Sequence, residues 1–303
     1  MQFVDNEIAI EVKEKNMIFR DAWRRSVYFR IGFVILGSLV LIALLQPWLN
    51  QMLVGEIDPI SMGSFDAYID PSAGHPLGTD RWGRDWLALL LLGLRYSLLI
   101  AFLAGSVATA IGIVIGFVAG YKGGRLDSVL RTMTDMVLVI PSLPLLVTLA
   151  AYIPRVNVVV MALLLAAFSW PFTTRTIRSQ VLSLKERPYV DLAKTSGMRD
   201  MEIIFAEILP NLFPYLGVSL AISMGAAMLA EIGLQLIGLG PGNINTLGLM
   251  INWTIRWGAL GLGKWQMVFA PVGCLVLIFV GLNLVNIGLE QAFNPRLRAV
   301  TGQ

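Results

Sequence analysis

The chain alternates between long apolar runs and short polar segments along most of its 303 residues. A helix needs about 20 mainly apolar residues to cross the hydrocarbon core of a bilayer. Runs of this length recur, and only a turn at 154–155 separates the two in the middle. The pattern predicts an all-α, polytopic membrane protein with six transmembrane helices, at Ile31–Leu49, Ser97–Gly120, Met136–Ile153, Val156–Phe172, Leu212–Gly238 and Met267–Leu289.

The positions of the basic residues predict the orientation of these helices. Lys and Arg concentrate in cytoplasmic loops of membrane proteins, and most of the 23 basic residues fall at 13–30, 122–131, 175–199 and 296–298. We therefore expect both termini on the cytoplasmic side. The domain boundaries that follow are a cytoplasmic segment at 1–30, a transmembrane domain at 31–290 with a cytoplasmic loop at about 175–210 and outer loops at about 50–96 and 239–266, and a cytoplasmic tail at 291–303.

The composition narrows the class of protein. Hydrophobic residues make up 56% of the chain and charged residues 14%, against about a quarter charged in soluble domains. The net charge of +3 reflects membrane topology, so we expect no nucleic-acid partner. Arg24 and Arg25 precede the first span and no small-residue cleavage site follows it, so we expect no cleaved signal peptide.

Residues suited to catalysis or metal binding are scarce. The single histidine, His75, stands in an outer loop without other metal-ligating residues near it in sequence, and a structural role is favoured. The single cysteine, Cys274, lies within the sixth span, where a lone thiol packs as a small apolar group. We expect no catalytic residue, no metal site and no cofactor bound by this chain.

Small residues and prolines mark the helix faces. Glycine or alanine recurs every fourth residue in the second span, at Ala108, Gly112, Gly116 and Gly120, and again in the fifth, at Gly217, Ala221 and Gly225. Such a stripe lets a neighbouring helix approach closely, within this chain or in a partner subunit. Pro141 and Pro144 predict a kink, and Pro141 and Ser142 are candidates for lining a translocation path, although a purely structural bend explains them equally well.

Three carboxylates lie at membrane depth, where ionisable groups face a cavity or a partner. Asp135 and Glu290 have basic neighbours in sequence, Arg131 and Arg296, and a structural role is favoured. Glu231 has none. Two readings of Glu231 stay open: it lines the translocation path, or it satisfies a contact between helices.

The polar segment at 189–210 is the most informative part of the chain. Pro188 suits a helix start, Asp191 falls in the first turn, and Gly197 is a natural stop. Ala193 and Gly197 share a face, which predicts a flat spot for a partner protein. We expect a second helix at Met198–Ile208, with an apolar stripe against the membrane domain at Met201, Ile204, Phe205 and Ile208, and prolines 210 and 214 at the entry to the fifth span.

This segment resembles the EAA motif of ABC importer permeases, E-A-A-x3-G-x9-I-x-L-P. Asp191, Leu192, Ala193, Gly197, Leu209 and Pro210 fall at motif positions, while Asp replaces Glu, Leu replaces the first Ala and Glu207 takes the isoleucine position. In that family the first helix is the coupling helix, which docks on the ATPase subunit. The resemblance implies that the residues meeting the ATPase are Tyr189, Asp191, Leu192, Ala193, Gly197 and Met198.

Further motifs resemble the C-type permeases of the dipeptide, oligopeptide and nickel transport group. The sequence HPLGTDRWGRD at 75–85 is similar to that group's signature before the second span, and 120–124 reads GYKGG, followed by Asp127, Asp135 and Pro141. Glu231, the IGLG run at 237–240 and the NPRLR tail at 294–298 extend the match, with Asn294 where the group usually has Asp. The resemblance covers about residues 25–298.

The resemblance implies a type I ABC importer permease fold in a prokaryotic plasma (inner) membrane. Its implied partners are a homologous B-type permease, two ATPase subunits that bind ATP and Mg, an extracytoplasmic substrate-binding protein, and membrane lipid. It implies peptide import, with oligosaccharide or nickel import as alternatives; Thr246–Met250 and the tail look more like the oligosaccharide importers. An ion-driven secondary transporter is the alternative from another class, but inverted repeats and a midplane carboxylate relay are missing.

Overall fold

A computed structural model describes residues 22–24, 26–54, 58–153, 156–240 and 244–293. The turn at 154–155, most of the 1–30 segment and the tail from 294 onward lie outside the described residues. Within the described ranges the chain is helical apart from loops and one isolated bridge between Thr79 and Asp85. The all-α prediction is therefore confirmed.

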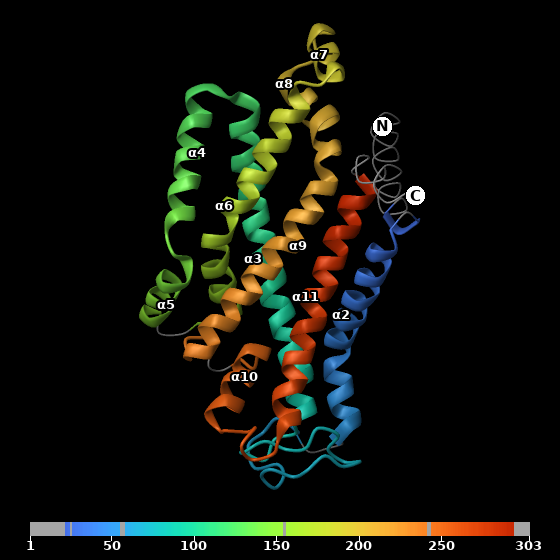
Figure 1. Cartoon of the computed structure of the whole chain (residues 1–303), viewed down its shortest axis with the longest axis vertical. Helices are drawn as coiled ribbons and strands as arrows, with labels where there is room; N and C mark the ends of the chain where they lie inside the picture. Colours follow the sequence, from blue (N-terminus) through green and yellow to red (C-terminus); the bar gives the residue numbers. More distant parts are fainter. Residues whose placement is uncertain (1–21, 25, 55–57, 154–155, 241–243, 294–303) are drawn as a thin grey trace, which may run out of the picture.

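Long helices run side by side along the molecule (Figure 1). They are α2 (Val27–Val54), α3 (Trp86–Lys122), α6 (Val158–Lys185), α9 (Leu209–Ile237) and α11 (Trp265–Phe293). The shorter helices are α4 (Gly124–Val139), α5 (Ser142–Tyr152), α7 (Pro188–Thr195), α8 (Asp200–Glu202), a π-helix (Ile203–Ile208) and α10 (Leu247–Arg256). Helices α7 and α8 lie at one end of the bundle, and α10 lies towards the other end, near the loop that follows α2 (Figure 1).

Five described helical stretches are long and apolar enough to cross a membrane, and the α4–α5 pair makes a sixth if it is counted as one broken span. The predicted third span, Met136–Ile153, is wrong as a single helix. The chain turns by 79° between α4 and α5, because Pro141 has no N–H with which to continue the helix. The predicted kink is thus confirmed, and it divides an amphipathic helix from a short apolar one.

The glycine stripe of α3 packs against α6 of the same chain. A Cβ added at Gly116 would lie 2.7 Å from the Thr174 carbonyl oxygen, and one at Gly120 would lie 2.9 Å from Val181 Cβ. No methyl group fits there, so the two helices touch through their backbones. The stripe of α9 is looser, since a Cβ at Gly217 would lie 3.1 Å from Leu289 of α11. Both stripes therefore serve contacts inside the subunit.

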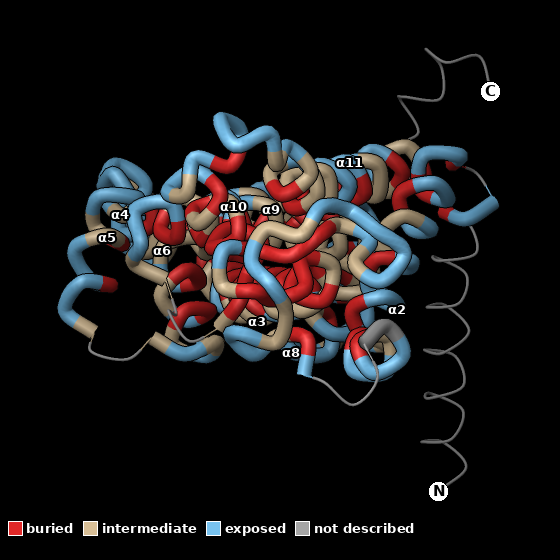
Figure 2. Tube along the Cα trace, turned by 90° about the horizontal axis from the view of Figure 1, so that it is seen from below, coloured by how far each residue is buried: buried red, intermediate tan, exposed pale blue. Residues whose placement is uncertain are grey.

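Buried residues concentrate along the middle of the bundle, around α3, α9 and α10 (Figure 2). One apolar cluster joins α2, α3, α9, α10 and α11, and a second joins α3, α5, α6 and α9. A third cluster connects α7 and the π-helix to α6 and α9. Apolar packing therefore attaches α7 to α6, and to α9 by way of the π-helix.

Candidate functional site

Helix α7 forms the projecting tip at one end of the bundle (Figure 1). It begins at Pro188, whose missing N–H costs nothing at a helix start, and Asp191 stands in its first turn. It ends at Thr195, and Gly197 then takes a φ of +80°, a value that glycine adopts without strain. The Met198 N–H donates back to the Ala193 carbonyl over 3.2 Å. The predicted helix start and stop are both confirmed.

The two faces of α7 have different surroundings. Val190 is fully buried and Ala193 is 6% exposed, both against the cluster shared with α6 and α9. Asp191, Leu192 and Gly197 are exposed. The expected flat spot at Ala193 is therefore not open to a partner protein, because positions 190 and 193 share the face that packs on the bundle.

Tyr189 and Met198 belong with the inward face. Both are partly buried against the same cluster. Burial raises the pKa of the Tyr189 phenol above its ordinary value. Of the coupling residues expected from the sequence, the outward set is Asp191, Leu192 and Gly197, and the supporting set is Tyr189, Ala193 and Met198.

The second predicted helix, Met198–Ile208, differs from the expectation. Helix α8, the π-helix and α9 follow one another without a break, as one helical stretch from Asp200 to Ile237. The π-helix ends two positions before Pro210, whose ring would collide with the carbonyl of Ala206 in a regular α-helix. The wider turn removes this collision, so the prolines do not interrupt the helix.

The π-helix also changes which side chains face the bundle. Ile203 and Ile208, five positions apart, are buried. Met201 and Phe205, which the α-helical stripe placed inside, are 61% and 59% exposed. Hydrogen bonds from i to i+5 bring residues five apart onto one face. The predicted stripe is correct at Ile208 and wrong at Met201 and Phe205 for this reason.

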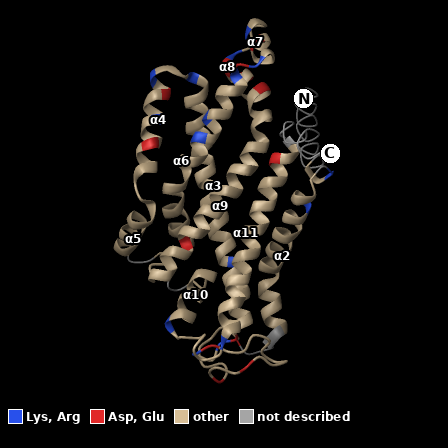
Figure 3. Ribbon diagram, in the orientation of Figure 1, with Lys and Arg blue, Asp and Glu red and all other residues tan. Residues whose placement is uncertain are grey.

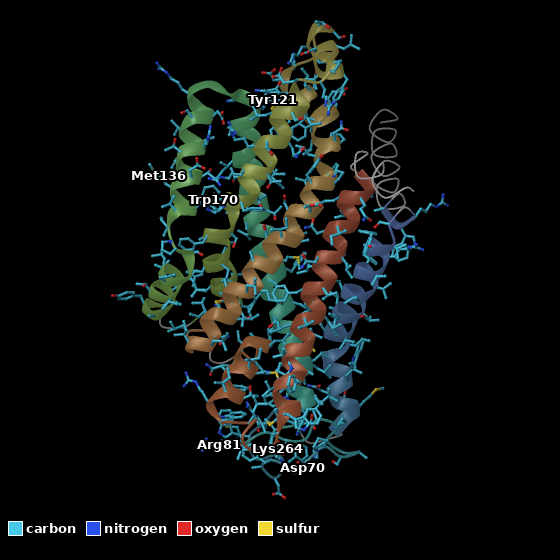
Figure 4. The ribbon with its side chains drawn as sticks, viewed as in Figure 1. Asp70, Arg81, Tyr121, Met136, Trp170 and Lys264 are labelled. Atoms are coloured by element: carbon cyan, nitrogen blue, oxygen red, sulfur yellow. The ribbon has the colours of Figure 1, made fainter. Side chains whose placement is uncertain are left out.

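A hydrogen bond ties the α7–α8 segment to the end of α3. The Tyr121 hydroxyl donates to Asp200 Oδ1 over 2.8 Å (Figure 4). A polar pocket of Tyr121, Lys122, Lys185, Glu186, Lys194 and Asp200 surrounds this contact. No local pattern predicts this contact, because 79 positions separate the two partners.

Glu231 is buried inside the subunit, at 1% exposure. Its Oε1 accepts a hydrogen bond from the Thr246 hydroxyl over 2.7 Å. Thr246 is the N-cap of α10, and its hydroxyl also accepts from the Leu249 N–H. Packing within one chain encloses the carboxylate, and whether Glu231 lines the translocation path stays a prediction. The contact between helices, which was the other reading, describes its position.

The candidate path residues Pro141 and Ser142 are exposed at the elbow between α4 and α5. Helix α5 reaches α9 from there, and a Cβ added at Gly233 would lie 2.9 Å from Leu143 Cδ1. The elbow presents a free surface on the described chain, as expected for a path or for an interface between subunits.

The other carboxylates expected at membrane depth are only partly as predicted. Asp135 Oδ2 lies 3.7 Å from Arg131 Nε, which confirms the expected pair, but its shorter contact of 2.6 Å is with Arg175 of α6. A second such pair joins Asp127 to Arg178. Glu290 is exposed, and its expected partner, Arg296, lies outside the described residues.

The loop 58–85 and α10 form a cap at the end opposite α7, where charged residues gather again (Figure 3). The Arg84 guanidinium lies 4.6 Å from the centre of the Trp82 ring and 4.5 Å from that of Trp253. Arg84 also binds Asp80 at 2.6 Å. A cation in contact with two indole rings and a carboxylate is held by several partners, so the loop and α10 form one unit.

Further contacts extend the cap. His75 Nδ1 lies 2.8 Å from Asp85 Oδ2, in keeping with the structural role expected for this histidine. Lys264 Nζ lies 2.6 Å from Asp70 Oδ1, and both lie at the cap end of the molecule (Figure 4). Trp257 packs edge-on against Trp82, whereas Trp265 is 62% exposed. Trp253 and Trp257 are only partly exposed, so the tryptophans of this end belong mainly to the packing of the cap.

Comparisons with known proteins agree on one class. Residues 112–299 match the family described as the binding-protein-dependent transport system inner membrane component. The chain is 32% identical to the oligopeptide transport system permease protein OppC of Lactococcus lactis subsp. cremoris (strain SK11), over 92% of this chain and 95% of that protein. It is 31% identical to the dipeptide transport system permease protein DppC of Bacillus subtilis (strain 168), over 97% and 91%.

The fold has a solved counterpart. A structure titled as inward-facing conformations of the MetNI methionine ABC transporter, in its native crystal form, superposes with a TM-score of 0.52 at 19% identity. The superposition covers 67% of this chain and 97% of that one. At this identity the likeness establishes a shared helical arrangement.

Proposed function

Because the chain belongs to the family of binding-protein-dependent transport system inner membrane components, we propose that it carries peptides across the membrane as one permease subunit of an ATP-driven importer. The protein is a multi-pass inner membrane transport permease and not an enzyme. The observation that carries the substrate assignment is the similarity over more than nine-tenths of the chain to oligopeptide and dipeptide permeases.

The partners we propose are a homologous B-type permease, two ATPase subunits and an extracytoplasmic substrate-binding protein. ATP and Mg bind in the ATPase subunits, and this chain itself binds no cofactor. The projecting α7, with Asp191, Leu192 and Gly197 outward, supports a docking role for that end. The cap of loop 58–85 and α10 supports contact with the binding protein at the other end.

We propose that the α7 end is cytoplasmic. The start of α2 and the end of α11 lie together at that end, where the Ser26 hydroxyl donates to Gln291 Oε1 over 3.1 Å. The described basic residues at 122–131 and 175–199 are on the same side (Figure 3), in the sense of the positive-inside rule. Both termini are then cytoplasmic.

The mechanism follows from how α7 is attached. ATP-driven closure of the ATPase subunits draws the α7 helices of the two permeases together. Helix α7 follows α6 after only two residues, Glu186 and Arg187, and it packs on the π-helix that continues into α9, in the cluster around Val190 and Ile208. Movement of α7 therefore moves α6 and α9, and rocking of packed helices alternates access to the path.

The experiment that tests this function uses the complete transporter, this chain together with its proposed partners, reconstituted in lipid vesicles. We expect ATP-dependent uptake of labelled dipeptides or oligopeptides, and no uptake of oligosaccharides or of nickel ions. Leu192→Glu should abolish co-purification of the ATPases. Leu260→Glu, at a similarly exposed residue of the cap end (60% against 68%), should leave it intact. Uptake of a sugar or of nickel without peptide uptake would replace the substrate assignment.

A further inference from the structure

Helix α4 is held against the chain differently from the long helices. Thr134 is its one buried residue among those described. A cleft of about 320 Å³ lies between α4 and its neighbours α3 and α6, lined by Ala119, Arg131, Thr134, Asp135, Thr174, Arg175 and Arg178. Close-packed side chains fix the relative position of two helices, and across this cleft such packing is missing.

Two arginine–carboxylate contacts bridge α6 and α4 instead. Arg178 holds Asp127 through both carboxylate oxygens, with Nη2 2.7 Å from Oδ2. Arg175 holds Asp135 Oδ1 through Nη2 and Nε, at 2.6 and 3.1 Å. The two carboxylates stand about two helical turns apart on α4. Two directional contacts at different heights fix both the rotation and the axial position of α4 relative to α6.

Both ends of α4 are joints. Gly123 caps the start of α4 and Gly124 is its first residue, with φ values of +66° and +61°, and a Cβ at Gly124 would meet nothing within 4 Å. Pro141 follows the last turn, at the 79° bend. Glycine adopts many backbone conformations at low cost, so α4 can pivot at 123–124 unless side chains restrain it.

Helix α6, in contrast, is firmly attached to α3 and to α7. The backbone contacts at Gly112, Gly116 and Gly120 leave no space between α3 and α6. Only Glu186 and Arg187 separate α6 from α7. A displacement of α7 therefore reaches α3 and α6 as a pair, and it reaches α4 through the ion pairs.

We propose that Arg178–Asp127 and Arg175–Asp135 are positioning contacts that make α4, and with it the elbow at Pro141, follow α6 when α7 moves. This inference rests on the proposed function, because it concerns how ATP-driven movement of α7 reaches the α4–α5 elbow. Ion pairs suit this task, since two charged groups can separate and meet again without opening a packed apolar core. None of these four residues acts chemically on a substrate.

A distance measurement tests the restraint directly. Spin labels at Val129→Cys on α4 and Phe172→Cys on α6, both at exposed positions, report the α4–α6 separation in the full chain with Cys274→Ser, in lipid. We expect a narrow distance distribution. Asp127→Asn together with Asp135→Asn should broaden it, while Arg125→Gln should not, because Arg125 stands on α4 without an ion pair among the described residues. An unchanged distribution in the doubly neutralised chain would overturn the proposal.

Charge exchange tests the role in transport. Asp127→Arg or Arg178→Asp alone should lower the substrate moved per ATP hydrolysed by about fivefold, the change in equilibrium expected from one partly exposed ion pair, with complex yield retained. The two changes together restore the pair with reversed charges and should recover most of the ratio. Equal ratios in all variants, or no recovery in the exchanged chain, would count against a positioning role. The spin-label measurement does not depend on transport, so its result can be interpreted even if the proposed function is wrong.

Discussion

The Tyr121 hydroxyl, in the last turn of α3, donates a hydrogen bond over 2.8 Å to Asp200 Oδ1 at the start of α8. The bond thereby joins the end of α3 to the start of α8, next to α7. The bond is solvent-accessible, and a neutral donor on a carboxylate at such a position contributes about 1 kcal/mol. Its value lies in fixing the base of the projecting α7.

Removing this hydroxyl should weaken coupling more than folding. We expect Tyr121→Phe to lower peptide uptake by about threefold, in line with the loss of somewhat less than 1 kcal/mol of α8 attachment, with thermal stability almost unchanged. Uptake and ATP hydrolysis measured on one preparation check this. Tyr152→Phe, at an 83% exposed tyrosine of α5, is the matched control and should change neither uptake nor ATP hydrolysis.

Gly116 tests the tight α3–α6 contact. Gly116→Ala puts a methyl carbon 2.7 Å from the Thr174 carbonyl oxygen and 3.1 Å from the Arg178 nitrogen, so the helices must separate. We expect a loss of about 1–3 kcal/mol of stability, seen as a lower unfolding temperature in detergent. Gly37→Ala on α2, where a Cβ meets nothing within 4 Å, should be neutral or slightly stabilising. Equal effects of the two changes would contradict a close α3–α6 contact at Gly116.

Glu231 should matter for its shape and hydrogen bond. Glu231→Gln keeps an oxygen that can accept from Thr246, so we expect nearly normal complex yield and uptake. Glu231→Ala leaves the buried Thr246 hydroxyl without this partner and should cost about 1–3 kcal/mol. Yield and uptake of both variants are measured side by side. A large loss of uptake with normal yield in Glu231→Gln would favour the path-lining role after all.

The proposed orientation can be tested by cysteine labelling from outside intact cells. In a Cys274→Ser chain, Met62→Cys and Leu260→Cys at the cap end should react with an impermeant reagent, whereas Leu192→Cys in α7 should react only after lysis. The three native residues are exposed to similar extents, 69%, 60% and 68%. Differences in labelling then report the side of the membrane. Labelling of position 192 in intact cells would reverse the topology.

Features set by local sequence were predictable. Apolar runs predicted the five described helices that are long enough to cross a membrane, because their length matches the bilayer, although the third predicted span is broken. The four-residue glycine spacing predicted the close face of α3. Pro188 and Gly197 gave the bounds of α7, since their backbone preferences are intrinsic. Even so, the sequence did not reveal that the partner of the α3 stripe is α6. A stripe of small residues shows that some helix approaches closely, but not which helix it is.

Features set by tertiary contacts were missed. Asp127 and Asp135 were visible as charges, but their pairing with Arg178 and Arg175 depends on how α4 lies against α6. Ala193 was assigned to a partner because its small size suits any close approach, including the one it makes with its own bundle. The contacts of Arg84 join the loop 58–85 to α10, and no local pattern predicts that the two meet.

The orientation of α7 depends on the number of residues in the helical stretch that follows it, which contains the π-helix at Ile203–Ile208. A π turn is an α-helix holding about one residue too many, and each residue of an α-helix turns the chain by about 100°. Deleting a single residue inside the π-helix would relax it to an α-helix and keep the faces on either side in register, whereas deleting one from the regular helical turns of α9 would rotate everything before it by about 100°. The tip would then face a different neighbour, although every outward side chain on α7 had been kept.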